Sequence, residues 1–218
     1  MFHKNISTTH PSKNKSGHGL FPLLLQQYCQ HLRLPPLGGG ALLTVSATRA
    51  EVTAAAAPVD LPLFPICKTV IGAGNPYFDI NFCLAALNSD NESQYADDYQ
   101  KLAIIAVDLL TANATSTSAQ IGNLLKKQDN IEGPMRWCLQ ACQALYGSIL
   151  QMQPRCSDLV KEFRYGEAKS CLDQAAREAE QCEAEFVRRH VASPLTVEDG
   201  CAFKLAKLAS ALLQHADD

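Results

Sequence analysis

Residues 138–182 read CLQACQALYGSILQMQPRCSDLVKEFRYGEAKSCLDQAAREAEQC, and this stretch decides the fold. Its two apolar periodic segments meet at a turn near Tyr165-Gly166, which predicts an antiparallel pair of helices. In such a pair, two residues that face each other at the same height have residue numbers that add up to nearly the same total anywhere along the helices. Cys142 and Cys182 meet this condition together with a second cysteine pair, so we expect a disulfide between them.

The second pair, Cys156 and Cys171, has almost the same number sum and predicts another bridge across the same two helices. The small offset between the two pairs lies along the helix axis, and a kink at Pro154 would absorb much of it. Two candidate bridges on one helix pair are hard to obtain from reactive or buried free thiols. We therefore predict that these cysteines staple the helices together.

Nine cysteines in 218 residues are typical of a protein that folds in an oxidising compartment. They are Cys29, Cys67, Cys83, Cys138, Cys142, Cys156, Cys171, Cys182 and Cys201. The chain has no C-x-x-C motif, so the usual structural zinc signatures are absent. Cys138 and Cys201 are expected at similar heights in the bundle, but on the second and fourth helices. These helices are diagonal and normally too far apart for a disulfide, which leaves the pairing of the two cysteines open. Cys29 is expected to be removed with a leader or to stay unpaired.

Composition favours closely packed helices over a β-sandwich. Hydrophobic residues make up 47% of the chain but aromatic residues only 7%, so the core must consist mainly of Ala, Leu, Ile and Val. The net charge of −3 and the absence of a basic stripe give no reason to expect a nucleic-acid partner. No apolar run approaches the roughly 20 residues that a membrane-spanning helix needs, so we expect no membrane partner.

The first 57 residues differ from the rest of the chain. They combine a polar, basic start, a short apolar burst at residues 20–25 and a break rich in Pro and Gly. Small-residue cleavage sites follow, such as Val45-Ser46-Ala47. We interpret residues 1–57 as a leader that contains a processed secretion signal. An organelle transit segment and a disordered or mis-assembled N-terminus are the alternatives.

Residues 58–218 are expected to form one domain, made of a helical hairpin at 58–92 and a four-helix bundle at 93–218. In the hairpin, Cys67 and Cys83 bracket two glycines and a proline between short helical stretches. This pattern predicts a hairpin closed by its own disulfide. A bridge over a loop of that size contributes roughly 3 kcal/mol to stability.

The bundle is predicted from apolar residues that recur at three- and four-residue steps. The expected helices are Asp97–Lys127, Pro134–Phe163, Glu167–His190 and Val197–Gln214. Because their loops are short, neighbouring helices must be antiparallel, which predicts an all-α, up-down-up-down bundle. Pro154 should kink or briefly break the second helix, and Thr196, with Asp199 three residues later, should cap the last one.

No sequence pattern points to catalysis. A nucleophile elbow, a P-loop, a dinucleotide-binding glycine motif and H-E-x-x-H are all missing, so we expect no enzyme activity, no cofactor and no metal. Four glutamates on the third helix are interpreted as a solvated face: Glu178, Glu180, Glu183 and Glu185. Asn91 and Asn113 each begin a glycosylation sequon and are candidate acceptors if the chain is secreted.

Over about residues 61–214, the chain resembles the plant invertase and pectin methylesterase inhibitor family. The stretches that carry the resemblance are Cys67-Lys68-Thr69, Tyr77 to Leu87, Cys142 to Tyr146, Cys182 to Phe186, and Ser193-Pro194-Leu195-Thr196. The resemblance implies a four-helix bundle with a helical N-terminal hairpin. It also implies the disulfides Cys67–Cys83 and Cys142–Cys182, the second of which agrees with the pairing from helix heights.

Members of this family are secreted to the cell wall or the vacuole. The resemblance therefore implies an extracellular inhibitor that binds pectin methylesterase or acid invertase and occludes its active site. The Pro-Lys-Phe stretch of invertase-directed members is not found here, although the chain looks closest to the subgroup labelled as invertase inhibitors. Further departures are the long leader, Pro154, and the additional cysteines Cys29, Cys138, Cys156 and Cys171. A helical carrier of a small ligand such as a lipid, and a pollen or structural protein without an enzyme target, are the alternatives.

Overall fold

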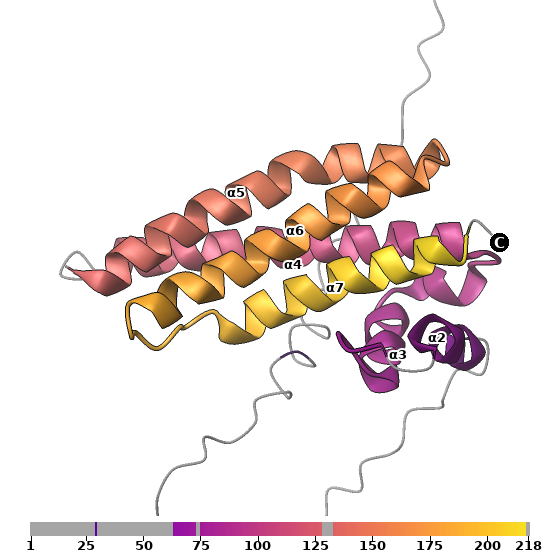
Figure 1. The fold of residues 1–218 in the computed structure, drawn as a ribbon, viewed down its shortest axis with the longest axis horizontal. Coiled ribbons are helices and arrows are strands. Elements are labelled where there is room, and N and C mark those ends of the chain that lie inside the picture. Colours follow the sequence, from indigo (N-terminus) through magenta and orange to yellow (C-terminus); the bar gives the residue numbers. More distant parts are fainter. Residues whose placement is uncertain (1–28, 30–62, 73–74, 128–132, 217–218) are drawn as a thin grey trace, which may run out of the picture.

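The computed structural model describes residue 29 and residues 63–72, 75–127 and 133–216 (Figure 1). In chain order, its helices are α2 (Leu63–Ile71), α3 (Ile80–Asn88), the 3-10 helix η1 (Asn91–Tyr95), α4 (Tyr99–Lys127), α5 (Pro134–Lys161), α6 (Tyr165–Arg188) and α7 (Thr196–Gln214). No strand occurs within the described ranges. The all-α fold predicted from the sequence is therefore confirmed.

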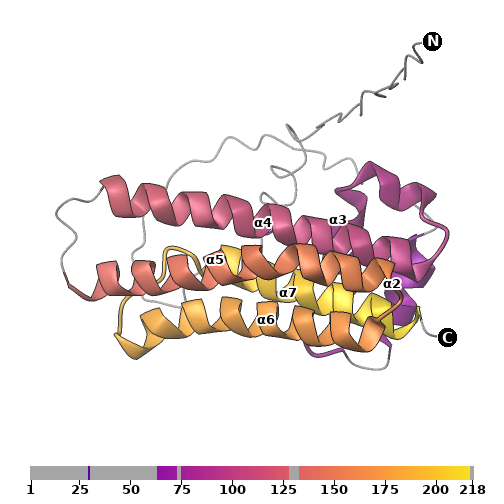
Figure 2. The same cartoon turned by 90° about the horizontal axis from the view of Figure 1, so that it is seen from above.

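Helices α4 to α7 form a four-helix bundle in which each helix runs antiparallel to the next (Figure 1, Figure 2). α4 and α6 each pack against both α5 and α7. The two diagonal pairs are therefore α4 with α6 and α5 with α7. The buried side chains between them are mainly Ala, Leu and Ile, with few aromatic rings, as the composition indicated. This arrangement confirms the up-down-up-down topology.

Helix α4 corrects one expectation. Residues Tyr99–Lys126 contain an 18-residue window with a mean hydropathy of 1.3, so by length and composition this helix could span a membrane. By this measure the expectation that no apolar run approaches the membrane-spanning limit is wrong. Half of that window is buried inside the protein, and Leu102, Ala106 and Leu110 are fully buried in the bundle core. A core helix of a soluble bundle meets the same criterion.

Helix α5 begins at Pro134, whose missing N–H needs no partner in the first helical turn. The preceding Gly133 has a φ of 88°, in the region that favours glycine. The helix then continues unbroken through Pro154 to Lys161, so the break considered from the sequence does not occur. Pro154 lies on the exposed side of α5, where water can solvate the carbonyl that a proline cannot pair.

The hairpin of α2 and α3 lies at the end of the bundle where α4 begins and α7 ends (Figure 1). A disulfide joins Cys67 to Cys83, with a Cα–Cα distance of 5.8 Å. Asp79 caps α3, because its carboxylate accepts a hydrogen bond of 2.8 Å from the backbone N–H of Phe82. Phe82 is buried, and the hairpin packs against α4 and α7.

The structure corrects the expectations for Cys29 and Cys201. Cys29 is 4% exposed and is bonded to Cys201 of α7, with a Cα–Cα distance of 6.0 Å. Cys138 cannot take this partner because it lies on the diagonal helix α5; its thiol donates instead to the backbone oxygen of Glu185 on α6, at 3.3 Å. Cys138 is the free cysteine of the described residues. Apart from Cys29, the expected leader at residues 1–57 lies outside them.

This pairing predicts the outcome of peptide mapping without reduction. We expect a cross-linked peptide that joins Cys29 to Cys201, and we expect Cys138 to be alkylated only after unfolding, because its thiol is buried. A leader that is cleaved after Cys29 would leave Cys201 as an alkylated thiol without its partner peptide. Mass spectrometry of the mature protein thus decides between the bridge and an early cleavage of the leader.

Candidate functional site

Two disulfides fasten α5 to α6 along their length. Cys142–Cys182 has a Cα–Cα distance of 4.8 Å, and Cys156–Cys171 has one of 5.7 Å. The structure thus brings together both pairs that the helix register pointed to. Cross-links at two levels restrict sliding and splaying of the two helices. The turn between α5 and α6 is therefore held by a rigid support.

Phe163 closes α5 at this turn in an uncommon conformation. Its φ is 60°, the left-handed region in which glycine normally ends a helix. Its N–H donates to the oxygen of Val160 at 3.1 Å, and the N–H of Arg164 donates to that of Leu159 at 2.9 Å. Together these two bonds form a Schellman motif. The helix predicted to include Phe163 therefore ends two residues earlier, at Lys161.

The side chain of Phe163 points largely to solvent, with 70% of its surface exposed. The ring of Tyr165 lies 6.1 Å away, centroid to centroid. Arg164 bonds the Glu167 carboxylate through two nitrogens, at 2.7 and 2.6 Å, which anchors the turn to the first helical turn of α6. We call residues 162–167 the α5–α6 tip. This tip presents an exposed aromatic side chain on a braced backbone.

The end of α6 repeats the same backbone device. His190 has a φ of 55°, its N–H donates to the oxygen of Val187 at 3.1 Å, and the N–H of Val191 donates to that of Phe186 at 3.1 Å. α6 therefore ends at Arg188, two residues before the end at His190 that the sequence predicts. The two caps lie at opposite ends of the bundle, because α6 runs the length of the bundle between them (Figure 1).

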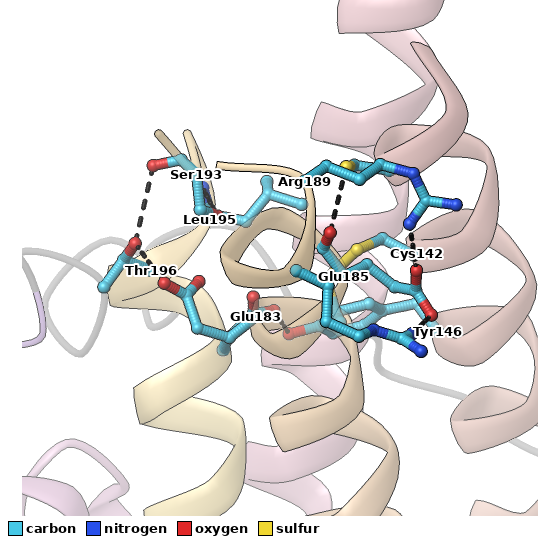
Figure 3. Close-up of a disulfide and its surroundings, with 12 residues drawn as sticks. Cys142, Tyr146, Glu183, Glu185, Arg189, Ser193, Leu195 and Thr196 are labelled. Carbon is cyan, nitrogen blue, oxygen red and sulfur yellow. Dashed lines mark hydrogen bonds and ion pairs between the residues drawn. A yellow bond between two sulfur atoms is a disulfide. The ribbon is translucent and has the colours of Figure 1, made fainter. Parts of the chain in front are cut away.

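A buried polar layer lies beside the Cys142–Cys182 bridge, where α5, α6 and α7 meet (Figure 3). The hydroxyl of the fully buried Tyr146 on α5 donates a hydrogen bond of 2.7 Å to Asp199 on α7. This bond joins two diagonal helices across the bundle. The carboxyl groups of Glu183 on α6 and Glu198 on α7 lie close enough to Asp199 to act on its charge. On the remaining helix, α4, Thr117 faces the Tyr146 hydroxyl. We call these five residues the polar layer.

Burial dominates the electrostatics of this layer. The pKa of Asp199 is raised to about 8, chiefly by desolvation, which the hydrogen bond from Tyr146 partly offsets. The carboxyl groups of Glu183 and Glu198 raise it further. Asp199 is therefore neutral in acidic conditions. In the described residues, no set of three or more His, Cys, Asp or Glu side chains is arranged to hold a metal ion.

The interpretation of the α6 glutamates as one solvated face is only partly right. Glu180 is exposed, but Glu178 accepts a hydrogen bond of 2.9 Å from Ser148 on α5. Glu183 accepts one of 3.0 Å from Thr196 on α7, and Glu185 is buried and paired with two arginines. Glu178 and Glu183 therefore bond across helices, whereas the ion pairs of Glu185 stay at the end of α6.

Thr196 is not the cap of α7 that the sequence suggested. It is the first helical residue, and its hydroxyl donates to Glu183 rather than accepting from the helix. Leu195 occupies the cap position, and its oxygen accepts from the N–H of Asp199 at 2.8 Å. Ser193 supports Leu195 by accepting its N–H at 3.0 Å. The polar side chains of this loop therefore connect α6 to α7.

The two sequons fall in different surroundings. Asn91 starts η1 and is exposed to solvent. Asn113 is half-buried within α4, and its side-chain oxygen is buried. A glycan fits the exposed Asn91, whereas Asn113 would have to be modified before α4 packs into the bundle. Both asparagines remain proposed acceptors.

The sequence predicts the turn near Tyr165-Gly166 but not the left-handed cap at Phe163 or the polar layer. Phe163 continues the apolar spacing of the helix, and no glycine marks the cap. A signal for the layer is present: Tyr146 follows Cys142 by one helical turn, so a tyrosine hydroxyl lies in the core beside a predicted bridge. A buried tyrosine usually finds a hydrogen-bond partner. The partner itself could not be chosen from the sequence.

Comparison with known proteins bears on most of the described fold. A family model described as plant invertase/pectin methylesterase inhibitor matches residues 66–212, which is more than half of the chain. The match begins in α2 and ends in α7, so it includes the hairpin, the α5–α6 tip and the polar layer. Members of that family are inhibitors rather than enzymes, and they are extracellular. No curated protein matches the chain.

Glycine substitutions at the two caps test the left-handed conformations. Phe163→Gly and His190→Gly should each stabilise the protein by about 0.5–1 kcal/mol, because a side chain with a Cβ is strained at these φ values. Thermal unfolding followed by circular dichroism should show a midpoint raised by about 1–4 °C. Phe163→Ala keeps the Cβ and is the control that should show no gain. Equal stability of the Gly and Ala variants would contradict a strained cap.

The polar layer predicts that stability falls as pH rises. The unfolded pKa of an aspartate is about 4, whereas that of Asp199 in the folded state is about 8. The folded state therefore binds the Asp199 proton more tightly than the unfolded state does. The contribution of this proton to the free energy of unfolding is complete below about pH 4 and is lost as pH rises through about 8. The loss is of the order of a few kcal/mol.

Asp199→Asn stays neutral at every pH, so its stability should depend less on pH than that of the wild type. Urea unfolding at about pH 4, 6 and 8 measures the difference between the two proteins, which cancels the titration of other groups. A wild type that is most stable near pH 8, or a variant with the same pH slope as the wild type, would show that Asp199 does not hold its proton in the folded state.

Proposed function

We propose that this chain, which belongs to the plant invertase/pectin methylesterase inhibitor family, is a secreted inhibitor that blocks the active-site cleft of its target enzyme with the α5–α6 tip. The target is pectin methylesterase or acid invertase. The observation that carries the proposal is the exposed Phe163, held in a left-handed conformation on a doubly bridged helix pair. Strained conformations of this kind persist where the surrounding structure enforces them, and they are common at ligand-contacting sites.

Rigidity suits a protein that inhibits by occlusion. Association is opposed by the ordering of loops and side chains at the interface, and a prearranged surface reduces that cost. At the tip, Arg164 and Glu167 are paired through two hydrogen bonds, and Cys156–Cys171 crosses the helices about two turns away. The tip can therefore enter a cleft without first losing much conformational freedom.

The chemistry of the tip also fits a protein-binding surface. Aromatic and arginine side chains account for much of the binding energy at protein interfaces, especially at their centres. Phe163, Arg164 and Tyr165 follow one another here, and the first of them is largely exposed before any partner binds. Burying the Phe163 ring in an enzyme cleft removes apolar surface from water, which favours the complex.

Four disulfides in the described structure support a secretory route, because such bonds persist in oxidising compartments. The cell wall is the proposed location, with the vacuole as the alternative. Both are acidic, and the neutral form of Asp199 is the one that the polar layer favours there. The polar layer therefore stabilises the fold under the acidic conditions of the proposed location.

Titration of the purified protein into pectin methylesterase and acid invertase assays at mildly acidic pH tests the target. Saturable inhibition of one enzyme identifies it. The proposal is rejected if neither enzyme is inhibited or bound, with binding checked by size-exclusion chromatography of the mixtures.

A matched pair of cap variants tests the contact surface. Phe163→Gly should weaken inhibition by at least about tenfold while leaving the fold as stable as the wild type or more so, since the ring is lost and the strain is relieved. His190→Gly makes the same backbone change at the opposite end of the bundle and should inhibit like the wild type. If both variants inhibit normally, the α5–α6 tip is not the contact surface, although inhibition through another face would remain established by the titration.

A further inference from the structure

A cleft of about 500 Å³ lies between the α2–α3 hairpin and the bundle, on the side of α6 and α7. This volume falls within the range of small-molecule sites. Its walls combine an aromatic ring, one ion pair, two amides and a hydroxyl over a small apolar base. The α5–α6 tip, at residues 162–167, does not line it. The cleft is thus a concave feature that the inhibitory surface does not use.

One wall is an aromatic platform. Tyr77 is 46% exposed, and its ring forms a T-shaped contact with that of Phe203 on α7, with the centroids 5.7 Å apart and the planes at 73°. The backbone N–H of Tyr77 donates to the side-chain oxygen of Asn75 at 2.8 Å. Both residues lie between Cys67 and Cys83, so the hairpin disulfide closes the loop that carries them. The ring is therefore held in place by Phe203 and by the Lys207 ammonium that lies over it, and the part that these neighbours leave uncovered is open to a ligand.

The facing wall is an ion pair. The ammonium of Lys207 on α7 lies 2.8 Å from the Asp173 carboxylate on α6 and 4.9 Å from the centroid of the Tyr77 ring. The Lys207 side chain is only 19% exposed, so its position is fixed by the carboxylate and the rings. Because the two charges balance each other, the cleft has no excess charge to attract a free anion or cation. It offers an acidic acceptor and a strong donor side by side.

Helix α7 completes the cleft with a regular stripe. Lys207, Ser210, Ala211 and Gln214 recur at three- and four-residue steps, so they share one face of the helix, and all four line the cleft. The stripe adds a hydroxyl and an amide, both of which can donate and accept hydrogen bonds. The Asn75 side chain uses its oxygen on Tyr77, which leaves its NH₂ group as a donor for a ligand.

We propose that this cleft binds the ring of a neutral hexopyranose sugar. A pyranose has an apolar C–H face, which can lie on the exposed Tyr77 ring, and hydroxyl groups that both donate and accept. Asp173 and Lys207 would bond adjacent hydroxyls, while Ser210, Gln214 and Asn75 would bond the others. A lipid tail would leave these polar groups unpaired, and an inorganic anion would have to compete with Asp173 for Lys207. An uncharged sugar can contact the Tyr77 ring with its apolar face and hydrogen-bond the polar side chains with its hydroxyl groups.

A single sugar ring has few atoms, so a dissociation constant on the order of millimolar is expected. Titration of ¹⁵N-labelled protein with D-glucose and with D-galactose, followed by two-dimensional NMR, measures it. We expect saturable shifts of the amides at residues 75–77 and 207–214. Tyr77→Ala should weaken binding at least tenfold. Tyr95→Ala removes a tyrosine that is 82% exposed and does not line the cleft, and it should bind like the wild type.

Asp173→Asn and D-galacturonic acid test the charge of the ligand. Asp173→Asn should weaken the binding of the neutral sugars, because the carboxylate acceptor is lost. The proposal is overturned if the shifts do not saturate, if Tyr77→Ala binds as the wild type does, or if D-galacturonic acid binds best and gains affinity in Asp173→Asn. The last result would identify an anion site at Lys207. These measurements need no enzyme target, so their outcome is independent of the inhibition assays.

Discussion

The hydrogen bond between Tyr146 and Asp199 is the interaction on which the bundle's interior depends. It joins the diagonal helices α5 and α7, which do not pack against each other as neighbours do. Thr117 of α4 and Glu183 of α6 complete the same layer, and Cys142–Cys182 lies one helical turn away. Apolar stripes alone allow helices to slide by a turn, whereas a buried polar contact is satisfied at only one register. This layer therefore selects one alignment of all four helices.

The ends of the bundle obey a different constraint. With their alignment fixed, α5 and α6 must turn within a few residues, and both Phe163 and His190 accept left-handed backbone conformations to do so. Such a conformation costs about 1–2 kcal/mol in a residue other than glycine. A stapled interior can bear that cost, because the Schellman bonds and the nearby cross-link leave the chain no easy alternative. The rigid interior of the bundle thus allows Phe163 to keep its strained backbone conformation and its exposed side chain at the tip.

Sequence reasoning succeeded where periodicity governs the structure. The bundle helices follow from apolar spacing, since spacing reports directly on which face is buried. Their antiparallel order follows from the short loops, and the register of α5 against α6 follows from the cysteine positions. It failed where a contact has no period. The bond from Cys29 to Cys201 joins parts of the chain 172 residues apart, and no pattern relates them. The inward orientation of Asp199 likewise depends on where Tyr146 stands across the bundle, which only the packed structure defines.

The tip and the polar layer lie in different parts of the molecule, and this separation has a physical consequence. Asp199 lies near the start of α7 and Glu183 near the end of α6, whereas the α5–α6 tip lies at the other end of the bundle, where α4 begins and α7 ends (Figure 1). Loss of the Asp199 proton therefore introduces buried charge far from the proposed contact surface. Near the tip, Cys156–Cys171 and the hydrogen bond of 2.8 Å from Gln100 on α4 to the oxygen of Val160 do not depend on that proton. Rising pH should thus loosen the α6–α7 end of the bundle first, while the α5–α6 tip keeps its shape until the whole fold gives way.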